Sequence, residues 1–507
     1  MTNPPSRLSR RLALALALSS ACALLAWTSL GGWKLPRIGG RQEDYYNLLV
    51  DGFRKGHLWL DIAVPPAVAT ASDPIRVMEQ NGVPVPHDMS LFRGRYYTYY
   101  GVVPTVVLFW PFRALTGSGL PLVLGSLAFA IGGFLLGAWL VLRLTEDFFP
   151  ETPAWLRIAG VWSFGIAAGQ LVLSRRVSIW EPSITAGHFF LVCMLASSYR
   201  ALRSARPGGW LAAAGLACGL AAGSRPSLAV AAAGLAPIVW AVGARGRRPA
   251  SLFRAALSAG APLACVAGAL LWYNWARFGN PLELGLGHQL STWNEVKRPH
   301  FRVAYMPFDA WLYLLSVPQW GRYFPFLHPI AVPRYPAGFY GYEYVYGLLF
   351  VCPVVLWAAA AVAGAAAARP LRVFMASVAI VGAATAAVIF SFDAAAARYE
   401  TDFFPWWVLL AYVGFLLARV RLRERGRSFL AACAAASFGL AAAFSCLTAF
   451  CASAEIHEVL QLVNPSAYHR LETLFDWPVA AVERLSGYKG GPIEMDVAFA
   501  ARPIGSV

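Results

Sequence analysis

The sequence predicts an all-α polytopic membrane protein with a bundle of about eleven transmembrane helices. Of its 507 residues, 58% are hydrophobic and only 13% are charged, whereas soluble domains carry about 25% charged residues. Apolar runs recur along the chain, and crossing a hydrocarbon core takes roughly 20 residues of helix. Arginine-rich loops alternate with loops that hold acidic and aromatic residues, as the positive-inside rule expects.

The first predicted span covers residues 12 to 32 and follows Arg10 and Arg11. A signal peptide begins in the same way, but this apolar run is long for one. It also leads directly into an interface marked by Trp27 and Trp33. We therefore interpret it as an uncleaved span with a cytoplasmic N-terminus.

A first outer loop, residues 33–119, follows this span. The apolar stretch 102–115 within it is short and carries Pro104, Pro111 and Arg113, so it spans poorly. If it crossed, every arginine-rich loop downstream would lie outside, against the positive-inside rule. We expect it to lie along the outer interface as a horizontal helix.

Ten further spans complete the predicted transmembrane domain, residues 1–451. A second large outer loop covers 276–343, and residues 452–507 form a short extracytoplasmic tail. The spans are 120–142, 156–174, 183–202, 209–223, 226–243, 253–275, 344–366, 371–391, 403–420 and 428–451. The inner loops then hold most of the arginines, among them Arg200, Arg203, Arg206, Arg245, Arg248, Arg369, Arg372, Arg421, Arg423, Arg425 and Arg427.

The formal net charge of +16 serves topology in this interpretation and does not indicate nucleic acid. The cysteines lie mostly inside apolar runs, and no spacing of ligand residues predicts a metal site. Phosphate-binding loops, zinc-protease motifs, nucleophile elbows and dinucleotide fingerprints are absent from the sequence.

Two acidic residues, Glu43 and Asp44, precede a segment, 45–53, whose apolar residues keep helical spacing. Acids are favoured at helix N-termini, so one interpretation is capping alone. The other is catalysis: a carboxylate placed here can take a proton from an attacking hydroxyl. The sequence leaves both open.

The same loop continues with PHDMSLFRGRYYTYYGVVP. It is either an interfacial aromatic cluster with arginine anchors or a wall of a binding site. Tyrosine rings stack on sugar faces, and arginine grips phosphate in a fork. The candidate binding residues here are His87, Asp88, Arg95, Tyr96 and Tyr97.

Further charged residues gather at the outer ends of the predicted spans. A guanidinium at such a depth is costly without a partner. Its partner is either an internal carboxylate or the phosphate of a lipid-linked substrate. These candidate substrate-binding residues are Arg175, Arg176, Glu181, Arg225, Arg277, Arg398, Glu400 and Asp402.

These features resemble the GT-C membrane glycosyltransferases, which include protein O-mannosyltransferases and lipid A aminoarabinose transferases. The segments YYNLLVDGF, GRYYTYYGVVP, GSRPS, YNWARFGNP and RYETDFFP resemble a little-characterised bacterial branch, over most of residues 40–410. In this superfamily the acid of the first outer loop is the catalytic base. The resemblance places that role on Glu43 and Asp44, with the order Glu-Asp where Asp-Glu or Asp-Asp is common.

The resemblance implies a multi-pass protein of the bacterial inner membrane with an extracytoplasmic active site. It implies a sugar donor linked to polyprenyl phosphate and contact with membrane lipid. The implied acceptor is a glycan, a lipid or a protein, and nucleic acid is not an implied partner. Transfer would proceed by single displacement. Some relatives use a divalent cation and others rely on Arg or Lys, so the resemblance leaves the cofactor open.

Two other classes remain as alternatives. A transporter or flippase of a lipid-linked anionic glycan would use the same outer arginines but needs polar residues through the membrane centre. The predicted span interiors are mostly Ala, Leu, Val and Gly, with Gln170 and His188 as exceptions. A non-catalytic scaffold would not require acids to gather with arginines.

Overall fold

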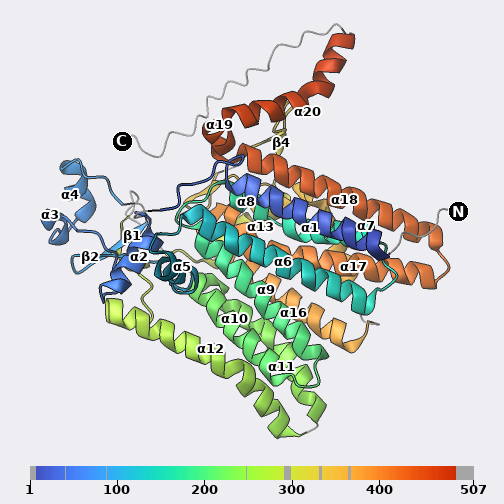
Figure 1. Ribbon diagram of the computed structural model, residues 1–507, viewed down its shortest axis with the longest axis horizontal. Helices are drawn as coiled ribbons and strands as arrows, with labels where there is room; N and C mark the ends of the chain where they lie inside the picture. Colours follow the sequence, from blue (N-terminus) through green and yellow to red (C-terminus); the bar gives the residue numbers. More distant parts are fainter. Residues whose placement is uncertain are drawn as a thin grey trace.

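The computed structural model describes residues 7–39, 42–86, 88–246, 248–290, 299–330, 334–362 and 367–486. Long helices lie side by side in one bundle, and the first outer loop sits at one end of it (Figure 1). The bundle is built from α1 (Arg7–Ser29), α6 (Leu122–Phe148), α7 (Ala154–Trp162), α8 (Gln170–Arg175), α9 (Glu181–Arg203), α10 (Gly208–Ser224), α11 (Leu235–Gly243), α12 (Pro249–Phe278), α16 (Arg369–Phe390), α17 (Phe404–Glu424) and α18 (Ser428–Glu455).

Shorter elements connect these helices or cover the end of the bundle. The short α-helices are α2 (Tyr45–Arg54), α3 (Pro66–Ala69), α4 (Pro74–Gln80), α5 (Trp110–Thr116), α13 (Met306–Leu315), α14 (Leu348–Val351), α15 (Ala359–Val362) and α19 (Val459–Val463). A longer helix outside the bundle, α20 (Pro465–Ser486), follows them. The 3-10 and π turns are η1 (Thr105–Phe109), η2 (Ser163–Ala167), η3 (Pro226–Gly234), η4 (Ala244–Gly246), η5 (Leu286–His288), η7 (Val303–Tyr305), η8 (Pro353–Ala358), η10 (Ala397–Asp402) and η11 (Ile456–Glu458).

The all-α prediction is confirmed for the bundle, but the loops add three small sheets. Strands β1 (Met89–Phe92), β2 (Arg95–Thr98) and β3 (Gln289–Leu290) form an antiparallel sheet in the order β2-β1-β3. The β1–β2 turn uses Arg93 and Gly94 at positive φ (50° and 69°), as tight hairpins require. Strands β4 (Gln319–Trp320) and β5 (Leu327–His328) pair antiparallel, and β6 (Gly341–Glu343) pairs parallel with β7 (Ala394–Ala396).

Within the described residues, seven helices are long and apolar enough to cross a membrane. The class of helical, multi-pass membrane protein is therefore confirmed, while the number of about eleven spans stays a prediction. The predicted span 156–174 is broken between η2 and α8, where Gly169 has φ 85°. The predicted span 344–366 begins as three short turns, α14, η8 and α15.

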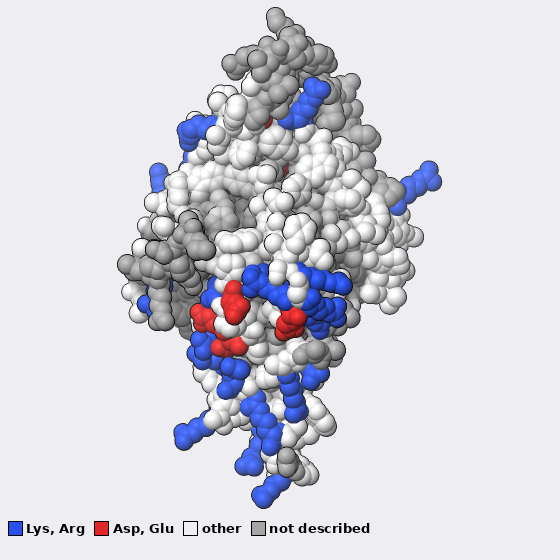
Figure 2. Space-filling view, turned by 90° about the vertical axis from the view of Figure 1, so that its right-hand side faces the viewer, with Lys and Arg blue, Asp and Glu red and all other residues white. Residues whose placement is uncertain are grey.

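Arginines lie at both ends of the bundle and have different partners at each end. At one end, Arg203 lies 3.6 Å from Asp147 and Arg423 lies 3.6 Å from Glu151. Figure 2 views this end and shows many Lys and Arg side chains with a few acids among them. At the opposite end, which we call the site end, Arg175 donates to carbonyls that close α1 and α18. The predicted sorting of loops and the side of the membrane that each end faces stay predictions.

The stretch 102–115 forms η1 and α5, which lie across the direction of the long helices (Figure 1). Its apolar helix runs from Thr105 to Thr116, about 18 Å at 1.5 Å per residue, too short for a core of about 30 Å. It packs against α2, where Phe109 stacks on Tyr46 at 5.0 Å. This geometry fits the predicted horizontal helix.

Candidate active site

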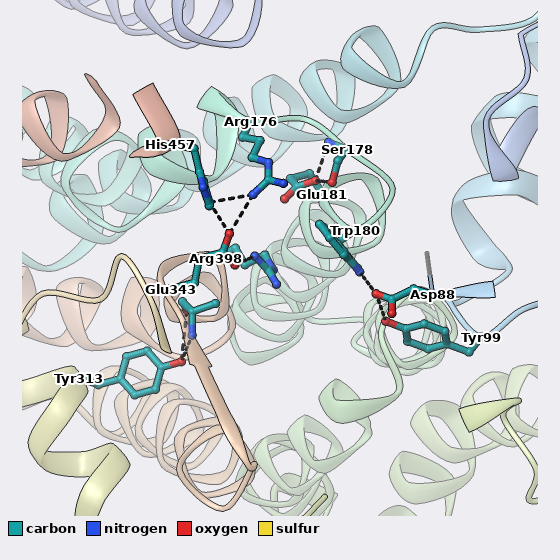
Figure 3. A network of polar contacts seen from close by, with 11 residues as sticks. Asp88, Tyr99, Arg176, Ser178, Trp180, Glu181, Tyr313, Glu343, Arg398 and His457 are labelled. Carbon is teal, nitrogen blue, oxygen red and sulfur yellow. Dashed lines mark hydrogen bonds and ion pairs between the residues drawn. The ribbon is translucent and has the colours of Figure 1, made fainter. Parts of the chain in front are cut away.

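A carboxylate in the second outer loop, Glu343, is the centre of the polar cluster at the site end (Figure 3). Its Oε1 accepts from Arg176 Nη1 at 2.9 Å and contacts His457 Nε2, and its Oε2 accepts from Arg398 Nη1. Burial alone would raise the pKa of Glu343. The hydrogen bond from His457 and the charges of Arg398 and Arg176 outweigh burial and lower this pKa to about 2. Glu343 is therefore a firmly ionised anion inside a ring of donors.

The cluster continues from Arg398 into the first outer loop. The Arg398 guanidinium lies 4.6 Å from the Trp180 ring centroid, a cation–π distance. Trp180 Nε1 donates to Asp88 Oδ2 at 2.7 Å, and Tyr99 donates to the same oxygen at 3.3 Å. Gln289 donates to the other oxygen of Asp88. Four segments far apart in sequence thus meet in one network, as Figure 3 shows in part.

Glu181 is the first residue of α9 and is only 3% exposed. It accepts hydrogen bonds from Ser178 N at 2.7 Å and Ser178 Oγ at 2.9 Å. An acid at the first turn of a helix also interacts favourably with the helix dipole. These contacts hold a buried carboxylate beside Arg176 and Arg398, which line the same pocket.

The pocket is small, with a volume of about 30 Å³, close to that of one water molecule. Arg176 uses only Nη1 in the contacts above, and 41% of its side chain is exposed. Arg398 Nε is buried without a hydrogen-bond partner. Guanidinium N–H groups therefore remain for a further ligand, and two arginines in fork geometry suit a phosphate.

A second small cavity lies next to this pocket and shares Val172 and Ala397 with it. Its lining is mostly apolar but includes Glu400 and Tyr346. Burial raises the pKa of Glu400 well above its usual range, which favours the neutral acid. Glu400 thus belongs to the neighbouring cavity, and it is not one of the groups that contact Glu343.

Asp44 is the N-cap of α2, as the capping interpretation expects. Its Oδ1 accepts from the backbone N–H groups of Tyr46 and Asn47, both at 3.0 Å, and Oδ2 accepts from the Asn47 amide at 2.6 Å. Burial raises the pKa of Asp44. Tyr46 ties this helix start to the α8–α9 turn, because its hydroxyl donates to Ile179 O at 3.0 Å. Glu43 is exposed beside it.

Arg225 and Asp402 form an ion pair, with Nε to Oδ2 at 2.6 Å. The internal carboxylate, one of the two partners that the sequence left open, is thus present for Arg225. Tyr399 separates this pair from the Glu343 cluster: its ring lies 4.9 Å from the Arg225 guanidinium and 5.1 Å from that of Arg398.

Several predicted binding residues contact the backbone of the chain, and their role in binding stays a prediction. Arg175 donates to Ser453 O at 3.0 Å and Thr28 O at 3.2 Å, and Arg277 donates to Thr98 O at 2.8 Å. These guanidiniums hold helix ends and loops together through backbone carbonyls.

Three predicted residues of the first outer loop belong to its own packing. Arg95 lies over Trp59, 3.6 Å from the ring centroid. Tyr96 is buried in the small core of the loop, and Tyr97 packs on Phe278 at 5.1 Å. His87 lies outside the described residues.

In the part of the chain that the structure describes, no group of three or more His, Cys, Asp or Glu side chains is placed to hold a metal ion. Whether the protein uses a divalent cation stays an open prediction. We assign no residue and no chemical step to a metal.

Two central residues, Glu343 and His457, were not predicted from the sequence. Glu343 is the single acid among the aromatic residues of YGYEYVYG, which is only a weak indication of a functional carboxylate. His457 follows α18 with no motif around it. Its role depends on the return of α18 to the site end, which sequence spacing does not reveal.

No family model and no curated protein matches the chain. Among solved structures, the apo oligosaccharyltransferase of Archaeoglobus fulgidus is similar with a TM-score of 0.48 and 15% identity, over 87% of this chain and 56% of that chain. The archaeal oligosaccharyltransferase AglB of the same organism, in complex with an inhibitory peptide and a dolichol-phosphate, gives 0.48 and 15% over 89% and 57%. The chain thus spans little more than half the length of these proteins. Similarity of this extent establishes neither family nor activity.

Proposed function

We propose that the protein is an integral-membrane glycosyltransferase of the GT-C type. It would move a sugar from a polyprenyl-phosphate donor to an acceptor at the outer face of the membrane. The observation that carries the proposal is the pocket at the site end, where Arg176 and Arg398 keep unused N–H donors beside the carboxylates of Glu181 and Glu343. The resemblance of the first outer loop to GT-C enzymes supports the same function.

The donor defines what each group does in this proposal. Its phosphate would lie against Arg176 and Arg398, because guanidinium forks match phosphate oxygens. Its prenyl tail would stay among the apolar helices at this end. The acceptor hydroxyl would form a bond to the anomeric carbon as the bond from that carbon to the phosphate oxygen breaks. Polyprenyl phosphate leaves, and the single displacement inverts the anomeric centre.

Asp44 is the proposed base that takes the proton of the acceptor hydroxyl. Burial raises its pKa, and a carboxyl that is harder to ionise is a stronger base once ionised. Glu43 is the second candidate because it lies beside Asp44 and is exposed. The acceptor would be a glycan, a lipid or a protein.

The test distinguishes a role of Asp44 as the catalytic base from its role as the cap of α2. Asn caps a helix as well as Asp does, so Asp44→Asn keeps α2 but removes the base. We expect Asp44→Asn to lower transfer of radiolabelled sugar by about 10²–10⁴-fold with an unchanged melting temperature. Glu43→Gln should cause a smaller loss.

Asp44→Ala is the matched variant, and it should lose the cap as well, at a cost of about 1 kcal/mol. Near-normal transfer by Asp44→Asn would assign Asp44 to capping alone. Asp51→Asn and Asp88→Asn would then identify the base. A transporter would move the lipid-linked sugar across the bilayer of a vesicle without releasing polyprenyl phosphate.

A further inference from the structure

The position of Glu343 has the chemistry of an anion-binding site. Arg176 Nη1, Arg398 Nη1 and His457 Nε2 converge on one carboxylate from three separate parts of the chain. A carboxylate and a phosphate present similar oxygen edges to a guanidinium. Glu343 therefore occupies a position where the same three donors can bind a phosphate.

The backbone around this contact is held in an uncommon conformation. Tyr344 directly follows Glu343 and has φ 51°, while His457 and Glu458 have φ 48° and 53°. Residues other than Gly rarely adopt positive φ, and each such residue costs on the order of 1 kcal/mol. The backbone is therefore strained both next to Glu343 and at His457. The ion pairs of Glu343 stabilise this backbone conformation.

The strand that carries Glu343 is short. Glu343 ends β6, a strand of three residues that pairs with β7 through Gly341, Tyr342 and Glu343. Its side chain is 27% exposed, so it can leave the arginines without crossing a packed core.

We propose that Glu343 is an internal stand-in for the donor phosphate. It occupies the phosphate position until the donor binds, and the phosphate of the donor then displaces it and releases β6 from Arg176, Arg398 and His457. This inference rests on the proposed phosphate-linked donor. It explains why Glu343 holds two arginines that a phosphate site needs, in a pocket of only about 30 Å³.

The experiment measures binding of farnesyl phosphate to the full-length protein in nanodiscs. If the Glu343 contact is closed in about nine molecules of ten, its removal tightens binding about tenfold. We therefore expect Glu343→Gln to bind farnesyl phosphate about tenfold more tightly than the unmodified protein. Glu455→Gln is the matched control: it also removes one carboxylate, which lies 3.5 Å from His328, and its affinity should not change.

Equal or weaker binding by a folded Glu343→Gln would overturn the proposal, because Glu343 would then be a structural partner of the arginines. If that variant does not fold, hydrogen exchange of the unmodified protein gives the answer. Farnesyl phosphate should speed exchange in Gly341–Val345, and slowed or unchanged exchange there would overturn the proposal.

The proposal about Glu343 and the proposed function can fail separately. Tighter binding by Glu343→Gln without any sugar transfer by the unmodified protein would keep the displaced carboxylate and refute the glycosyltransferase. Sugar transfer by the unmodified protein without tighter binding by Glu343→Gln would keep the glycosyltransferase and refute the displaced carboxylate.

Discussion

Arg225→Ala should destabilise the protein and leave the affinity for a prenyl phosphate nearly unchanged. The Arg225 Nε lies 2.6 Å from Asp402 Oδ2, and the two side chains are only 17% and 2% exposed. Removing one partner of a buried pair strands the other charge, which typically costs about 3–5 kcal/mol. Burial already raises the pKa of Asp402, and Arg225 is the charge that opposes this rise.

The sign of the pH effect follows from the loss of Arg225. Asp402 then keeps only the effect of burial, so its folded pKa lies further above the unfolded value of about 3.9. A raised pKa gives stability that is complete below the unfolded value and lost as the pH rises through the folded value. Arg225→Ala should therefore be most destabilised at high pH.

The assay is a double-mutant cycle of unfolding free energies for the unmodified protein, Arg225→Leu, Asp402→Leu and the pair. Replacing both members of a buried pair by apolar residues is often nearly neutral, so the double variant should regain most of the lost stability. The reasoning is refuted if Arg225→Ala keeps the normal melting temperature while its affinity for farnesyl phosphate falls tenfold. Arg225 would then be a ligand of the donor.

Two further predictions concern the second outer loop and the topology. Asp309 is fully buried, and burial together with the charge of Asp393 raises its pKa from 3.8 to about 8. The stability that it gives is complete below pH 3.8 and is lost as the pH rises through about 8. Asp309→Asn should abolish this decline in thermal unfolding, and an unchanged slope would contradict it. A reporter fused after Val507 should be active only outside the cytoplasm, because arginine-rich loops mark the inner side; cytoplasmic activity would refute this layout.

Periodicity and charge were enough to predict the class of fold. Apolar runs of sufficient length become helices because the backbone must satisfy its own hydrogen bonds in lipid. The helix after Asp44 was also predictable, since an acid before apolar residues at helical spacing is a start signal. The break at Gly169 could not be predicted from hydropathy, because the run 156–174 is apolar on both sides of the break.

The candidate site was only partly predictable, and the reason is the tertiary arrangement of the loops. Arg176, Glu181 and Arg398 meet, as the sorting of charges suggested. Sequence could not tell which arginines would find a partner within the chain. Arg175 and Arg277 are held by backbone carbonyls, and a carbonyl leaves no mark in the pattern of residue types.

The network at the site end also depends on pairings that sequence alone does not encode. Glu343 reaches the arginines through the β6–β7 pair. Such a pair of three residues carries too little periodicity to be predicted. His457 arrives from the far end of α18, and only the packing of the bundle places it there.

Release of polyprenyl phosphate tests the central claim most directly. The purified protein, in nanodiscs with membranes of the source cell as acceptor, would be given a radiolabelled polyprenyl-phosphate sugar. The account predicts that labelled sugar moves to an acceptor with inverted anomeric configuration, that free polyprenyl phosphate appears in equal amount, and that Asp44→Asn prevents both. A donor that binds and stays intact under these conditions would contradict the assignment of this site to glycosyl transfer.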